Sequence, residues 1–161
     1  MTKHVELTVL ESGVTAVAEL YEDDAPRTAA AIWEILAQPY EARTVHGIFE
    51  GRKITLEPPA ANRTIDPVKI PRENTTAYPV GGDLLWYYFA PRAVRGIPEG
   101  LWDVMVIYGP EAILKNPLGI IACNLWGHII DNLDAFASEC ADVRIHGAKT
   151  VRVARHSGEH R

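Results

Sequence analysis

The chain contains few of the residues that disulfide, metal and nucleophile chemistry require. Its 161 residues include only two cysteines, Cys123 and Cys140, which are too few for a disulfide framework. No HxxH, HExxH or CxxC spacing is present, so we expect no metal site, and we expect no cofactor. The three serines, Ser12, Ser138 and Ser157, fall in turn, helix and tail contexts, which argues against a serine triad.

Long apolar runs and a surplus of positive charge are also missing. No apolar stretch reaches the roughly 18 residues of a membrane-spanning helix, so a membrane partner is not expected. The net charge is -5 and the isoelectric point is near 5.7, which argues against nucleic acid as a partner. The N-terminal MTKHVELTVLESG alternates polar and apolar residues and has no signal-peptide core. Together with the two cysteines, this predicts a cytoplasmic protein with reduced thiols.

What the sequence does contain is a series of short β-forming runs divided by turns. Residues 4–21 alternate in hydropathy around ESG, which predicts a β-hairpin. Asp24 is the expected N-cap of a short helix that has Pro26 in its first turn. Trp33 lies on the apolar face of that helix, which we expect to pack on the barrel. At the other end of the chain, a tail from His156 is expected to be solvated.

About eight strands and two short helices are expected in all. Their mostly hairpin order favours a closed β-barrel over an α+β sandwich, because closure removes exposed strand edges. The helices would then cover or flank the open ends of the barrel. Neither a repeat nor an internal boundary is present, which predicts a single domain over residues 1–161.

Two segments resemble the cyclophilins. One is VAELYEDDAPRTAAAIWEIL, which has the order of that family's first strand-to-helix passage, and the other is CNLWGHIIDNLDAF, near the end of the chain. Nearly the whole chain more closely resembles a family of short, mostly prokaryotic proteins of unknown function with a cyclophilin-like fold (DUF3830-like). The matching segments are VHGIFEG, ENTTAYPVGGDLLWYY, VIYG and CNLWGHIIDNLDAF. This resemblance implies a mostly β, closed cyclophilin-like barrel.

One position argues against the activity of the cyclophilins, which catalyse prolyl isomerisation with an arginine that follows a strand histidine. Here the tripeptide is VHG, so Gly47 occupies the place of that arginine. Lowering a barrier of about 18–20 kcal/mol needs a positioned donor or charge near the proline nitrogen. Arg52 lies nearby as a replacement cation, although nothing in the spacing requires that role.

A face of one strand is the main candidate for a pocket wall. Asn124 and His128 alternate with Trp126, and a polar–aromatic–polar face is typical of a small pocket. The alternative is that Trp126 faces the core, as most strand aromatics do. His46 has two equally good interpretations, a core histidine bonded to the backbone or a pocket residue.

Charged and aromatic residues on other strands and loops complete the candidate set. Arg92 and Arg95 follow WYYF in a loop, where they are either solvated or placed to contact an anionic ligand. The candidate ligand-binding residues are His46, Arg52, Trp86, Arg92, Arg95, Tyr108, Asn124, Trp126 and His128. No catalytic residue is assigned.

The leading hypothesis is a binding protein for a small molecule or short peptide, built on a cyclophilin-like barrel without the standard isomerase arginine. A weak or atypical peptidyl-prolyl cis-trans isomerase is the alternative. A third hypothesis is a subunit whose barrel face mediates assembly, which would make a homo-oligomer the relevant partner.

Overall fold

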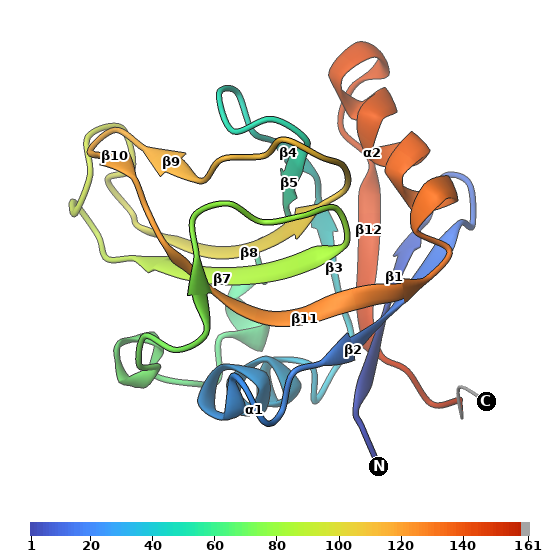
Figure 1. Cartoon of the computed structure of the whole chain (residues 1–161), viewed down its shortest axis with the longest axis horizontal. Coiled ribbons are helices and arrows are strands. Elements are labelled where there is room, and N and C mark those ends of the chain that lie inside the picture. Colours follow the sequence, from blue (N-terminus) through green and yellow to red (C-terminus); the bar gives the residue numbers. More distant parts are fainter. Residues whose placement is uncertain (159–161) are drawn as a thin grey trace.

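One antiparallel sheet dominates the computed structural model, which describes residues 1–158 (Figure 1). The predicted hairpin over residues 4–21 is present as the paired strands β1 (His4–Val9) and β2 (Thr15–Leu20). Across the sheet the order is β3 (Tyr40–Arg43), β12 (Thr150–Arg155), β1, β2, β11 (Cys123–Asp131), β7 (Asp83–Phe89), β8 (Leu101–Ile107), β5 (Lys53–Thr55) and β4 (Val45–His46). Strand β6 (Thr75–Thr76) pairs with β11, while β9 (Lys115–Asn116) and β10 (Gly119–Ile120) form a separate hairpin.

The two end strands of the sheet, β3 and β4, are neighbours in the chain. Only Thr44 separates them, so a bend at this residue brings the ends of the sheet together into a nearly closed barrel. Two hydrogen bonds of 2.8 and 2.9 Å join Thr44 to Lys149, the residue before β12, and they hold the bend in place. The predicted mostly β barrel with two helices is therefore confirmed.

Alternation along the strands divides the apolar residues between two cores. The larger core fills the barrel and includes Leu7, Leu84, Trp126 and Phe136. The smaller core lies on the other face of β7 and β8, where Leu85 and Met105 pack beneath the segment of residues 112–123. Several strands are thus buried on both faces.

The helices lie at opposite ends of the barrel in Figure 1, with α1 (Pro26–Ile35) below and α2 (Leu133–His146) above. The connection between β5 and β6 contains two short 3-10 turns, η1 (Ala60–Asn62) and η2 (Pro67–Lys69). Within residues 1–158, no helix combines the length and the hydropathy needed to cross a membrane.

The start of α1 differs from the sequence prediction. Its N-cap is Ala25, whose side chain makes no capping bond, so the assignment of Asp24 as the cap is wrong. The carboxylate of Glu73, 45 residues further along the chain, accepts hydrogen bonds of 2.6 and 2.8 Å from the Thr28 amide and hydroxyl. A distant loop therefore supplies the cap that the local sequence was expected to supply.

One further expectation is met in part and another needs correction. Trp33 packs against the barrel core as expected but is only partly buried, and the Arg155 guanidinium lies 4.5 Å from the centre of its ring. His156 does not begin a solvated tail, because its amide donates to the His4 carbonyl and its ring contacts Glu6. The remainder of that predicted tail, from residue 159, lies outside the described residues.

Candidate functional site

Strand β11 does not present Asn124, Trp126 and His128 on one face. Its pairing with β7 shifts between Leu125 and Gly127, so a β-bulge interrupts the alternation. Trp126 is 1% exposed and lies in the barrel core. His128 lies beyond the bulge, where its ring is 2.8 Å from the Asp83 carboxylate. The prediction of a shared face is wrong because sequence alternation cannot reveal an extra residue in one strand.

Asn124 is held by the protein itself. Its side-chain amide donates to the Thr28 hydroxyl at 2.9 Å and to the Pro71 carbonyl at 2.8 Å. Its side-chain oxygen accepts from the Glu73 amide at 3.4 Å. These bonds connect β11 to α1 and to the loop before β6. The side-chain nitrogen and oxygen of Asn124 therefore already have hydrogen-bond partners within the protein.

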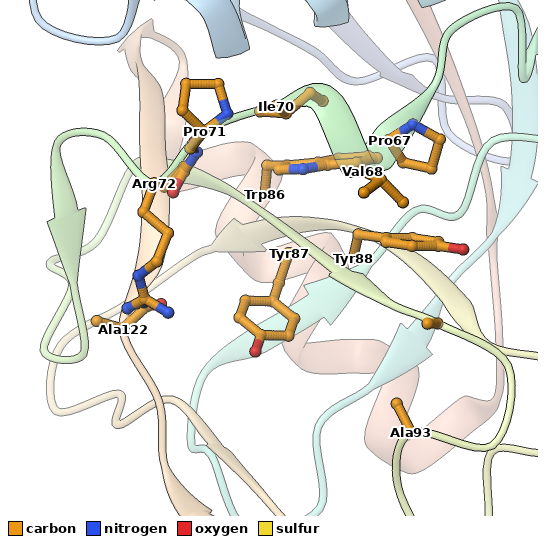
Figure 2. Close-up of a pocket in the computed structure, with 12 residues that line it drawn as sticks. Pro67, Val68, Ile70, Pro71, Arg72, Trp86, Tyr87, Tyr88, Ala93 and Ala122 are labelled. Carbon is orange, nitrogen blue, oxygen red and sulfur yellow. Dashed lines mark hydrogen bonds between the residues drawn. The ribbon is translucent and has the colours of Figure 1, made fainter.

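Trp86 and Asn124 line a cavity of about 420 Å³ that we call the aromatic pocket. Figure 2 shows Trp86 between Ile70 and Val68 of the loop, while Tyr87 points to the other side of the strand. Trp86 is 3% exposed, and its ring packs edge-to-face on Trp102 with centroids 5.7 Å apart. The Trp86 ring is thus buried, and the polar atoms of Asn124 that line this pocket already bond to the loop.

A larger cavity of about 700 Å³ lies between the β4–β5 turn, the start of β8 and the β9 strand. We call it the apolar groove. Its apolar side chains come from four separate segments of the chain, and they are Val45, Ile48, Phe49, Ile97, Leu101 and Pro117. Three of them, Val45, Ile48 and Phe49, are more than 60% exposed. Large apolar side chains gathered at one opening are typical of a binding surface.

Polar residues also line the groove. Four of them, Glu50, Lys53, Thr55 and Asp103, lie together, and we call them the buried charge cluster; the others are His46, Lys115 and Asn116. The Lys53 ammonium lies 2.9 Å from the Glu50 carboxylate and 3.3 Å from that of Asp103. The Thr55 hydroxyl donates to Asp103 at 2.8 Å. Lys53, Thr55 and Asp103 are buried, with exposed fractions of 5%, 6% and 4%, so these contacts operate with little solvent screening.

The pKa values of the cluster reflect burial and attraction between unlike charges. Burial raises the pKa of Asp103 and outweighs the opposing attraction of Lys53, while the like charge of Glu50 makes a smaller contribution in the same direction. Burial alone would lower the pKa of Lys53, but attraction to Asp103 and Glu50 outweighs it, and the net shift is upward. Lys53 is thus the cation that both carboxylates share.

A third cavity, of about 590 Å³, lies on the other side of the β4–β5 turn, against the C-terminal part of α2. We call it the arginine cleft, and it is lined by His46, Gly47, Ile48, Gly51, Arg52, Tyr108, Ala141, Arg144 and Ile145. The His46 Nε2 lies 2.6 Å from the Tyr108 hydroxyl. Three of the predicted site residues, His46, Arg52 and Tyr108, are therefore brought together here.

The remaining predicted residues stand apart from these cavities. Arg92 and Arg95 are exposed on the loop between β7 and β8, whereas their neighbours Ala90 and Ala93 line the aromatic pocket. His128 and Trp126 occupy different faces of β11. The proposed roles of these four residues in ligand binding remain predictions.

Sequence reasoning missed the buried charge cluster. The feature of the sequence that could have revealed the cluster is Asp103, the only charged residue in the strand LWDVMVI. A carboxylate inside a buried strand needs a cation beside it, so Asp103 implied a partner such as Lys53. Which lysine or arginine supplies that partner depends on strand pairing, which the local sequence does not contain.

Two solved structures with similar folds are McbB in complex with tryptophan and a cyclophilin from mimivirus. McbB has a TM-score of 0.65 at 17% identity, and the match covers 98% of this chain and 46% of McbB. The mimivirus cyclophilin has a TM-score of 0.55 at 12% identity, with 96% of this chain and 87% of that chain covered. The present chain thus spans just under half the length of McbB. At these identities the likeness shows a cyclophilin-like fold.

Sequence comparison gives the family. No curated protein matches this chain. The model of the family described as "Protein of unknown function (DUF3830)" matches residues 7–155, and the chain therefore belongs to that family.

Proposed function

We propose that the protein binds a small molecule in the apolar groove, and that this ligand combines an apolar body with a positively charged nitrogen. The observation that carries the proposal is the buried charge cluster lining a mostly apolar cavity of about 700 Å³. Perturbed ionisable groups in a large apolar cavity are the usual mark of a binding site. The volume lies in the range of small-molecule sites, so we place a small molecule before a short peptide.

The apolar part of the ligand would cover the rim of the groove. Ile48 and Phe49 are 84% and 80% exposed, and they follow the turn glycine Gly47 directly. Exposed apolar area contributes roughly 25 cal/mol per Å² when it is removed from water. A planar or branched hydrocarbon group that covers Ile48, Phe49 and Pro117 would remove this apolar area from water, which would favour binding.

The charged part of the ligand would meet the carboxylates. Within the buried charge cluster, Glu50 and Asp103 carry one more negative charge than Lys53 neutralises, whereas the second lysine that lines the groove, Lys115, is exposed to solvent. A buried charge without a counter-charge is costly, so a ligand ammonium beside Asp103 or Glu50 would lower the free energy of the site. An anionic ligand at the same place would raise it.

The fold comparison guides the choice of probe. The McbB structure contains tryptophan, which has an aromatic body and an ammonium group. We therefore choose three indole compounds as probes. Tryptamine has the amine alone, L-tryptophan has amine and carboxylate, and indole-3-propionate has the carboxylate alone.

Calorimetric titration of the three probes tests the proposal. Tryptamine should bind best, with tryptophan weaker and indole-3-propionate at least about tenfold weaker than tryptamine, which corresponds to about 1.4 kcal/mol. Phe49→Ala should weaken tryptamine binding several-fold, while Val68→Ala, a substitution of another exposed apolar residue, should not. Equal binding of all three probes, or no tryptamine binding at millimolar concentration, would contradict the proposal.

Assembly is a rival use of the same apolar rim. If Val45, Ile48 and Phe49 serve to join copies of the chain, sedimentation should show a concentration-dependent oligomer that Phe49→Ala dissociates. Under the binding proposal, Phe49→Ala changes the affinity for tryptamine and leaves the sedimentation coefficient unchanged. A homo-oligomer and a cytoplasmic location otherwise remain predictions from the sequence.

A further inference from the structure

Arg52 is held in a defined position beside the arginine cleft. Its side chain lies over Gly109, where any Cβ atom would overlap the Arg52 stem. One of its terminal nitrogens donates to the Pro110 carbonyl at 3.2 Å. A guanidinium has five N–H donors, so most of those of Arg52 stay available after this bond. Packing thus fixes the orientation of an arginine that is exposed to solvent.

Arg144 approaches the same cleft from the last turn of α2. Within residues 1–158, no carboxylate lies within 4.0 Å of the Arg144 or the Arg52 guanidinium. The acidic residue nearest in sequence, Asp142, is paired with Lys149 at 2.9 Å and with His146. Arg144 does compensate the negative end of the helix dipole, but that effect is worth only about 0.3–1 kcal/mol and uses none of its hydrogen-bond donors.

A hydrogen-bonded histidine–tyrosine pair, His46 and Tyr108, lines the cleft together with the two arginines. His46 Nδ1 lies 2.7 Å from the Gly47 carbonyl, which can only accept, so Nδ1 carries the proton. In the neutral ring, Tyr108 then donates its hydroxyl proton to Nε2 at 2.6 Å. Burial is the main cause that raises the pKa of Tyr108, while Arg144 and Arg52 oppose the rise. Both guanidinium charges therefore act on the same hydroxyl.

We infer that the arginine cleft binds an oxyanion, a carboxylate or a phosphate, between the Arg52 and Arg144 guanidinium groups. None of the residues that line it is acidic, although the chain as a whole has a net charge of -5. Planar guanidinium groups match the geometry of carboxylate and phosphate oxygens, and two of them beside one cavity form an anion site. This inference does not rest on the proposed function, because the apolar groove contains neither arginine, although the two cavities share the lining residues His46, Gly47 and Ile48.

Titration with inorganic phosphate and with succinate, followed by NMR at constant ionic strength, tests the inference. Phosphate or succinate should shift resonances around Arg52, Tyr108 and Arg144, whereas the same concentration of chloride should not. Whichever anion binds more tightly identifies the phosphate or the carboxylate as the preferred group. Arg52→Gln and Arg144→Gln should each weaken binding at least about tenfold, which is about 1.4 kcal/mol.

A matched variant serves as the control. Arg27→Gln removes an exposed arginine from α1, which lies at the opposite end of the barrel from α2, and should leave the affinity unchanged. If it weakens binding as much as Arg52→Gln does, the effect is general charge attraction and the inference is wrong. Absence of any binding above that of chloride would also overturn it. Tryptamine binding should be the same in Arg52→Gln and in the unchanged protein. The inference about the arginine cleft can therefore be wrong while the proposed ligand site in the apolar groove is right, and the reverse.

Discussion

At the scale of single residues, Gly47 occupies the place of the cyclophilin arginine and lies next to Glu50 of the buried charge cluster. A Cβ atom at this position would lie 3.1 Å from the Glu50 carboxylate, so the carboxylate occupies space that a side chain at residue 47 would need. That same carboxylate pairs with Lys53. A side chain at residue 47 would therefore require the Glu50 carboxylate to move by a few tenths of an ångström. Arg52 lines the arginine cleft together with Gly47.

Prolyl isomerase activity is accordingly expected to be negligible. A proline-peptide isomerisation assay should give a rate close to the uncatalysed one, because Gly47 occupies the position at which the cyclophilin arginine is expected. An ordinary cyclophilin assayed in parallel is the control. Should catalysis comparable to that control be observed, the prediction is wrong, and Arg52→Ala would then show whether Arg52 is responsible.

At the scale of elements, α1 depends on a loop that is distant in sequence. Glu73 binds the Thr28 amide and hydroxyl, and Asn124 of β11 binds the same hydroxyl. These bonds join the start of α1, the loop before β6 and strand β11 into one unit. The acidic run EDD satisfied the rule for a helix start, yet the capping group comes from another part of the chain.

Glu73→Ala should lower the free energy of unfolding by about 1–2 kcal/mol, because it removes a cap and leaves buried donors unpaired. Asp24→Ala, which removes the cap expected from the sequence, should change it by less than about 0.5 kcal/mol. Urea denaturation followed by circular dichroism measures both values. The reverse order of effects would mean that Asp24 caps the helix in solution.

At the scale of the whole molecule, the reactivity of the two buried cysteines can be used to follow the unfolding of the barrel. Cys123 lies in the smaller core on β11, and Cys140 lies on α2 against the larger core. Burial raises the pKa of Cys123 to about 12 and also raises that of Cys140. Thiolate is the reactive form, so neither residue should react while its surroundings stay folded.

If residues 1–158 unfold as one cooperative unit, both thiols should become reactive with the same free energy of opening. Reaction with Ellman's reagent across a urea series measures this value, and Cys140→Ala and Cys123→Ala assign it to each thiol. Agreement within about 1 kcal/mol is expected for a single domain. Reaction of Cys140 at much lower urea than Cys123 would show that α2 opens by itself.

The sequence predicted the fold well, and some of its candidate site residues line cavities of the structure. Alternation and turn signals gave the hairpin of β1 and β2, the β-rich barrel and both helices, because these patterns are local. Of the candidate residues, His46, Arg52 and Tyr108 line one cavity, and Trp86 and Asn124 line another. The shared face of Asn124 and His128 was wrong because the bulge near Gly127 reverses the alternation.

By itself the sequence determined the balance of charge, the β-rich barrel and the lack of an arginine at Gly47. Only the tertiary structure decided which side chains meet. The pairing of β5 with β8 places Lys53 beside Asp103, 50 residues apart, and the approach of α2 places Arg144 beside the cleft of Arg52. The physical reason is range: hydropathy patterns and turn chemistry act over a few residues, whereas a buried charge or an anion site needs partners that only the folded chain brings together.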